Sequence, residues 1–240
     1  MSKFTFSILI VLYSLTSLAQ EISTQTRDSV PLKKERYGLR LGVDLYKPIR
    51  SLYDKNYNGL ELVGDYRITR RHYLAAEIGN ENKTVEEQFL NFTTNGNYLK
   101  VGFDYNTYEN WGNMENMIYF GFRYGVSSFS QNLNHYEIYN TNHYFNEGPV
   151  IYTGQKYSGL SAQWLEVVAG VKVEVLKNVF AGFSFRLNRL LTQSKPNNFD
   201  NLYIPGFNKT YGGNYGIGFN YSVSYFIPLY KSTVKPKEKK

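Results

Sequence analysis

The sequence of 240 residues contains no cysteine. This absence excludes disulfide bonds, thiolate metal sites and a cysteine nucleophile, and it also excludes a lipoprotein anchored through an acylated N-terminal cysteine. Histidine is scarce, with only His72, His135 and His143. A catalytic cluster needs its nucleophile, base and orienting group within hydrogen-bond reach, and these histidines fall in predicted connections without an obvious serine and acid beside them. We therefore expect no enzymatic activity, no cofactor and no bound metal.

Long apolar runs are also missing after the N-terminal segment, which excludes a membrane protein built from helices. The chain starts MSKFTFSILIVLYSLTSLAQE, in which Lys3 precedes an apolar run that ends near Leu15 and is followed by the small-x-small sequence SLA. This is the pattern of a secretory signal peptide. We predict that residues 1–19 are removed by cleavage between Ala19 and Gln20. The alternative, an N-terminal membrane anchor, would need roughly 20 apolar residues.

The chain has alternating segments in place of apolar runs. Residues 215–227, YGIGFNYSVSYFI, put apolar side chains on one face and Gly, Asn and Ser on the other, because successive side chains of a strand point to opposite faces. Such segments occur at 37–46, 59–68, 73–79, 98–108, 117–129, 161–175, 179–188 and 215–227. Short and long connections alternate between them, as in a barrel with short periplasmic turns and long external loops.

We therefore predict an all-β fold, an eight-stranded antiparallel, up-and-down transmembrane β-barrel in the outer membrane of a Gram-negative bacterium. The mean hydropathy of −0.43 agrees with strands that are polar on one face. The alternative is a secreted sandwich or lipocalin-like barrel whose apolar face points inward. The predicted long external loops are residues 47–58, 80–97, 130–160 and 189–214.

The two ends of the mature chain are predicted to lie outside the barrel of residues 37–230. Residues 20–36 form a polar leader without periodicity, and residues 231–240 form a basic tail. Both contribute to the formal charge of +7, which we interpret as solvated termini and not as a nucleic-acid patch. The leader contains Asp28-Ser29-Val30, which resembles the O-glycosylation acceptor motif of Bacteroidetes and leaves glycosylation of Ser29 open.

The predicted strands place charged side chains of both signs on the inward face. This set comprises Arg40, Asp44, Glu61, Asp65, Arg67, Glu77, Lys100, Asp104, Arg123, Glu166, Lys172, Glu174 and Arg186. An eight-stranded barrel is just wide enough inside for its own side chains, and unpaired buried charges are very costly. We expect a structural charge network that closes the lumen. The alternative is a narrow channel, or porin, that conducts through these charges.

The external loops are rich in Asn and Tyr, as in QNLNHYEIYNTNHYFNEG. Tyrosine offers rigid contact area and asparagine adaptable hydrogen bonds, so the loops form a candidate surface for a protein or glycan. The other expected partner is outer-membrane lipid, and we expect a monomer that binds no nucleic acid. The alternative is a subunit of an envelope transport complex whose basic tail makes the periplasmic contact.

Aromatic residues near the strand ends are candidate interfacial anchors. These are Trp111, Trp164, Tyr46, Tyr73, Tyr108 and Tyr225. Trp164 falls on the inward phase of its strand, so a contact between this residue and a loop inside the lumen is the alternative.

The signal ending LAQ, the Asn- and Tyr-rich strands, and KERYGLRLGVDLYKPI before and in the first strand resemble a family of uncharacterised outer-membrane barrel proteins of Bacteroidetes. The architecture also resembles the small OmpA- and OmpX-type barrels, although no peptidoglycan-binding domain follows Tyr230. The resemblance implies an outer-membrane barrel without an assigned activity, and so it implies no catalytic residues.

Overall fold

The computed structural model describes residues 33–87, 89–110, 114–138, 150–196, 200–208 and 214–234. Residues 36–232 form one compact unit, and the two chain ends belong to a second unit. The predicted signal peptide, its Ala19–Gln20 cleavage site and Ser29 lie outside the described residues. Within those ranges, no helix is long and apolar enough to cross a membrane.

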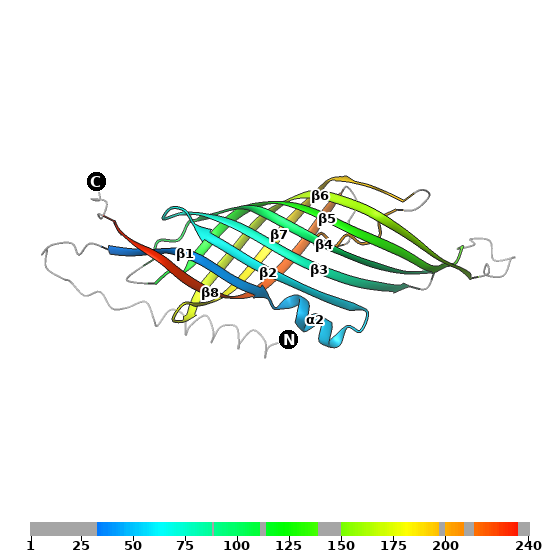
Figure 1. The fold of residues 1–240 in the computed structure, drawn as a ribbon, viewed down its shortest axis with the longest axis horizontal. Coiled ribbons are helices and arrows are strands. Elements are labelled where there is room, and N and C mark those ends of the chain that lie inside the picture. The colour runs from blue at the N-terminus through cyan, green and yellow to red at the C-terminus, as the bar shows by residue number, and fades with distance from the viewer. Residues whose placement is uncertain are drawn as a thin grey trace, which may run out of the picture. The chain divides into compact units, whose positions relative to one another are not determined.

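The described residues form eight strands and one helix. Their bounds are β1 Lys33–Asp44, α2 Tyr46–Tyr53, β2 Tyr57–Arg67, β3 His72–Glu87, β4 Leu90–Asn106, β5 Met117–Tyr136, β6 Ile151–Leu176, β7 Val179–Gln193 and β8 Tyr215–Val234. The strands follow one another in sequence order around a closed barrel (Figure 1), and the pairs from β1–β2 to β7–β8 are antiparallel. The predicted eight-stranded, up-and-down architecture is confirmed.

The two ends of the barrel differ in construction. At one end, here named the turn end, short turns join β2 to β3 and β6 to β7, and Asn178 takes a left-handed conformation (φ 66°) in the second of these turns. The opposite end, named the mouth, carries α2, the tips of two long hairpins, and residues 200–208 (Figure 1).

The barrel is apolar outside and charged inside. Outward residues such as Leu62, Phe103 and Val167 are about half exposed, whereas the inward Glu61 and Glu166 are buried. The β5 side chains alternate between buried and exposed along the strand, as the period of two predicts. A sandwich or lipocalin-like barrel would bury the apolar face, so that alternative is wrong.

Two predicted loops are largely strand. Residues 80–97 extend β3 and β4 into one hairpin that reaches Glu87 and Leu90, and residues 130–160 extend β5 and β6 to Tyr136 and Ile151 (Figure 1). Backbone pairing requires a neighbouring strand, not an apolar outer face. The outward side chains of these hairpins are mostly polar, as in the cross-strand Thr84–Thr93 hydrogen bond of 3.0 Å, so the hairpins lack the apolar outer face on which the alternation signal depends.

Other boundaries also shift. β1 ends at Asp44, and the predicted loop 47–58 contains α2. β7 continues to Gln193, into the predicted loop 189–214. Residues 33–36 of the predicted leader lie in β1, and residues 231–234 of the predicted tail lie in β8. These segments are polar or of mixed character, so hydrophobic alternation does not distinguish them from loops.

Candidate functional site

The structure places the predicted inward set inside the barrel. Arg40, Asp44, Glu61, Asp65, Arg67, Glu77, Lys100, Asp104, Arg123, Glu166 and Arg186 are buried. Lys172 and Glu174 are half-buried toward the turn end. These side chains come from β1 to β7, and they form linked groups along the lumen.

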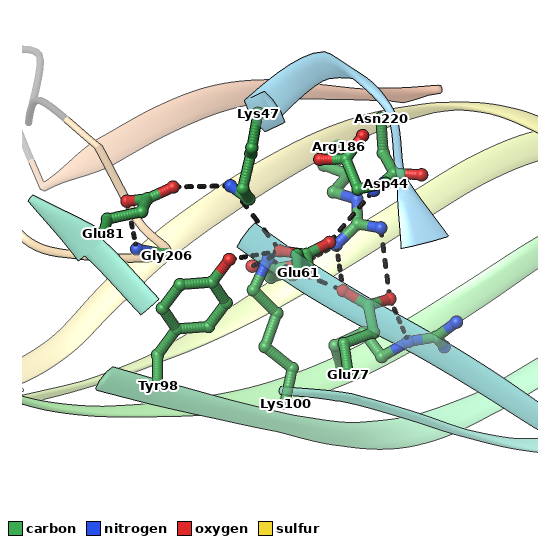
Figure 2. A network of polar contacts seen from close by, with 12 residues as sticks. Asp44, Lys47, Glu61, Glu77, Glu81, Tyr98, Lys100, Arg186, Gly206 and Asn220 are labelled. Carbon is green, nitrogen blue, oxygen red and sulfur yellow. Dashed lines mark hydrogen bonds and ion pairs between the residues drawn. The ribbon is translucent and has the colours of Figure 1, made fainter. Parts of the chain in front are cut away.

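Glu77 is the centre of the middle group. Its carboxylate forms ion pairs with Arg186 at 2.5 Å, Arg123 at 3.3 Å and Lys100 at 3.6 Å. The Glu166 carboxylate also pairs with two of these cations, Arg186 at 3.3 Å and Lys100 at 3.2 Å. Figure 2 shows Glu77, Arg186 and Lys100 converging from different strands. Each cation is shared by two or more carboxylates, so the charges compensate one another across the lumen.

A second group lies toward the turn end. Asp65 joins Arg40 at 2.7 Å and Lys172 at 2.6 Å. The Arg40 guanidinium also lies 5.1 Å from the ring centroids of both Tyr73 and Phe180. Tyr73 is buried inside the barrel, so its predicted role as an interfacial anchor is wrong.

The remaining inward charges extend these groups. Asp104 lies 2.7 Å from Arg123, and Glu174 lies 3.4 Å from Arg36. Arg67 donates to the carbonyl oxygen of Arg36 at 2.9 Å.

Residues 200–208 fold into the mouth and cover part of it. Ile204 and Phe207 are buried, and the Phe207 ring meets Trp164 edge-to-face with centroids 5.9 Å apart. Trp164 is 0% exposed, and its Nε1 donates to Glu166 at 2.7 Å. Trp164 is therefore not an interfacial anchor, and the alternative of a loop contact inside the lumen is correct. Trp111 lies outside the described residues.

The helix α2 covers another part of the mouth and sends Lys47 into the lumen. Lys47 Nζ lies 2.5 Å from Glu81 and 3.6 Å from Glu61. Burial by itself would lower the pKa of Lys47, but these two carboxylates outweigh it and raise the pKa well above its ordinary value. The lysine is therefore held in its charged form.

Glu81 joins three elements at the mouth (Figure 2). Besides Lys47 of α2, it accepts hydrogen bonds from the Tyr203 hydroxyl at 2.8 Å, the Gly206 amide at 3.0 Å and the Tyr57 hydroxyl at 3.0 Å. Sequence reasoning missed Lys47 and Glu81 because both fall in predicted loops. Continuing the inward phase of β3 beyond Glu77 would have found Glu81, whereas nothing in the sequence pattern marks Lys47.

A cavity of about 410 Å³ lies between α2, the β3–β4 hairpin and residues 202–208, and it is named the mouth cavity. Arg50 and Lys83 line it, and both bind the Asp54 carboxylate, at 3.2 Å and 3.0 Å. The hydrogen bond from Lys83 holds the pKa of Asp54 below its usual value. The apolar lining is Val85, Leu90, Phe92, Leu202, Ile217 and Phe219.

The histidines are distributed over separate parts of the chain. His72 begins β3 and lies 2.8 Å from the Thr69 hydroxyl, and His135 lies near the end of β5 against the Tyr152 ring. His143 lies outside the described residues. In the part of the chain that the structure describes, no group of three or more His, Asp or Glu residues is placed to hold a metal ion.

Residues 1–232 match the model of a family described as "Domain of unknown function (DUF6048)". Among solved structures, the chain is similar to the crystal structure of Ail, the attachment invasion locus protein of Yersinia pestis. That comparison has 12% sequence identity and a TM-score of 0.41, and it covers 80% of this chain and 97% of the other. No curated protein matches the sequence.

Proposed function

The chain belongs to this family of unknown function, and we propose that it is an outer-membrane β-barrel with a closed polar lumen that acts at the cell surface through its mouth. The observation that carries the proposal is a closed ring of strands with exposed apolar side chains outside and buried charges inside. Such an exterior suits lipid and not water. A closed barrel also satisfies its backbone hydrogen bonds internally, as a membrane requires.

The proposal of a closed lumen is supported by the pairing of its charges and by the cover over the mouth. A permeating ion would have to separate pairs such as Arg186–Glu77, which is buried and 2.5 Å long, and the loss of one partner of such a pair is strongly unfavourable. It would also have to displace Phe207 or Lys47, both of which are buried.

We place the mouth on the outer side, because short turns lie on the periplasmic side in barrels of this class. The β3–β4 and β5–β6 hairpins and α2 would then face the exterior as a rigid surface for a protein or glycan. Residues 1–19 would serve as the export signal.

The test combines cell fractionation with conductance. The full chain should enter the outer-membrane fraction and show a heat-dependent mobility shift on gels. The refolded protein should produce no conductance steps in a planar bilayer. Reproducible conductance steps would overturn the closed lumen in favour of the narrow channel, and Arg123→Gln would then change ion selectivity. Deletion of residues 235–240 tests the transport-subunit alternative, because loss of a co-purifying protein would support that alternative.

A further inference from the structure

The inward face of the β3–β4 hairpin changes character near the mouth. On the turn-end side of Lys83, the inward positions of β3 carry the carboxylates of Glu77 and Glu81. On the side toward the hairpin tip, the next inward position is Val85, which lies opposite Phe92 of β4. Leu202 packs against this region, but Val85 and Leu90 remain half-buried and line the mouth cavity. An apolar wall on the inner side of a hairpin cannot serve lipid contact on the outside of the barrel.

The side of the mouth cavity next to α2 carries more positive than negative charge, because Lys83 of β3 reaches it as well as Arg50 of α2. Two cations, Arg50 and Lys83, share the single Asp54 carboxylate. Arg50 uses Nε and Nη2 for this contact, so its Nη1 has no partner among the described residues. The guanidinium stacks 4.2 Å above the Tyr57 ring, which fixes its plane. The cavity thus offers free, oriented donors on one side and apolar side chains on the other.

We propose that the mouth cavity binds a single-chain amphiphile with an anionic head group, either a carboxylate or a phosphate. The chain lies on Val85, Leu90 and Leu202, and the head is held by Arg50 and Lys83. Glu87 also lines the cavity, at the hairpin tip where its backbone pairs with that of Leu90. Its carboxylate would repel an anionic head there, so the head belongs on the α2 side. The volume of about 410 Å³ falls in the roughly 300–1,000 Å³ range of small-molecule sites.

The experiment uses the full chain refolded into phosphatidylcholine vesicles, with binding measured by equilibrium dialysis and corrected by protein-free vesicles. The probes are octanoate and octyl phosphate. Octanol supplies the chain without the charge, and acetate and inorganic phosphate supply the head without the chain. We expect saturable binding of the two amphiphiles, with each control weaker by at least about tenfold, because a charge-assisted contact contributes on that scale.

Two variants move the affinity in opposite directions. Lys83→Gln removes a cation and should weaken octanoate binding by about tenfold. Asp54→Asn removes the competing carboxylate and should strengthen binding several-fold, which a purely structural role of the cluster would not do. Lys156→Gln, at an exposed position of β6, is the matched control and should change nothing. Tighter binding of octyl phosphate than of octanoate would assign a phosphorylated lipid fragment, and the reverse would assign a fatty acid.

Equal affinity for octanol and octanoate, together with no response to Asp54→Asn, would overturn the inference. No saturable component above that of protein-free vesicles would also overturn it. This inference rests on the proposed function in one respect: the ligand arrives from the outer side of the membrane because the mouth is placed there. Protein that shows the heat-dependent mobility shift but no binding refutes the ligand site alone, whereas protein without that shift refutes the proposed barrel.

Discussion

Lys47 of α2 and Glu81 of β3 form a buried ion pair of 2.5 Å that fastens the helix to the barrel wall. The same carboxylate accepts hydrogen bonds from Tyr203 and Gly206, so one side chain holds both covers of the mouth. A change at Glu81 should therefore release the helix and residues 200–208 together.

Glu81→Gln tests this coupling. The substitution keeps the size of the side chain but leaves the buried Lys47 with Glu61 alone at 3.6 Å, and we expect the mouth to lose roughly 3 kcal/mol of stability. Trypsin should then cleave after Arg50 faster than in the wild type. Glu86→Gln, on the exposed side of the same strand, is the control. Equal cleavage rates in the two variants would contradict the coupling.

Gly125→Ala should prevent the native packing of Trp164. A Cβ at position 125 would overlap the Trp164 ring, and a fully buried ring cannot move away without strain. We expect a lower yield of protein with the heat-dependent mobility shift. Gly218→Ala is the matched control, because the nearest atom to its Cβ, in Arg186, is 3.8 Å away. Equal refolding of both variants would refute this packing.

Phe207→Ala should open the cover above Trp164. Removal of a fully buried aromatic ring costs about 3–5 kcal/mol, and water would then reach the indole. In a Trp111→Phe background, the emission of Trp164 should shift to longer wavelength and become quenchable by acrylamide. The control is Phe103→Ala, which removes an outward ring. An unchanged emission in Phe207→Ala would show that residues 200–208 do not cover Trp164.

Alkaline pH should loosen residues 200–208 through Tyr203. Burial and the Glu81 carboxylate raise the pKa of this phenol well above its ordinary value of 10. Because the pKa of Tyr203 is raised in the folded state, its contribution to the stability of the closed mouth is fully present below about pH 10. Above that pH the open form releases a proton that the closed form retains, so stability falls by up to about 1.4 kcal/mol per pH unit.

The measurement is Trp164 emission between pH 8 and 12 in the Trp111→Phe background, compared with the same background carrying Tyr203→Phe. Tyr57, Arg50 and Glu81 also face this phenol, so the difference between the two proteins isolates the Tyr203 contribution. The variant should lack that part of the transition and should be less stable at neutral pH by about 1 kcal/mol, because it loses the hydrogen bond to Glu81. Identical emission profiles of the two proteins would show that ionisation of Tyr203 does not loosen residues 200–208.

Hydrophobic alternation predicted much of the barrel because it reports a local property. In a strand, the position of a residue decides its face, so Glu77 and Leu99 could be assigned inward and outward without knowledge of their neighbours. The same test missed the outer halves of β3 to β6, where the outward face is polar and pairing depends on the adjacent strand. It also missed Lys47, because α2 is a short helix whose inward side is defined only by the barrel beneath it.

By itself, the sequence determined the number of strands, their order, and the charged character of the interior, since each follows from a period of two and from the lengths of connections. The tertiary structure alone decided that Trp164 lies under Phe207 and that Glu81 binds Gly206, a residue 125 positions further along the chain. Such contacts form when the closed ring brings distant segments to one end, and no local pattern encodes which segment enters it.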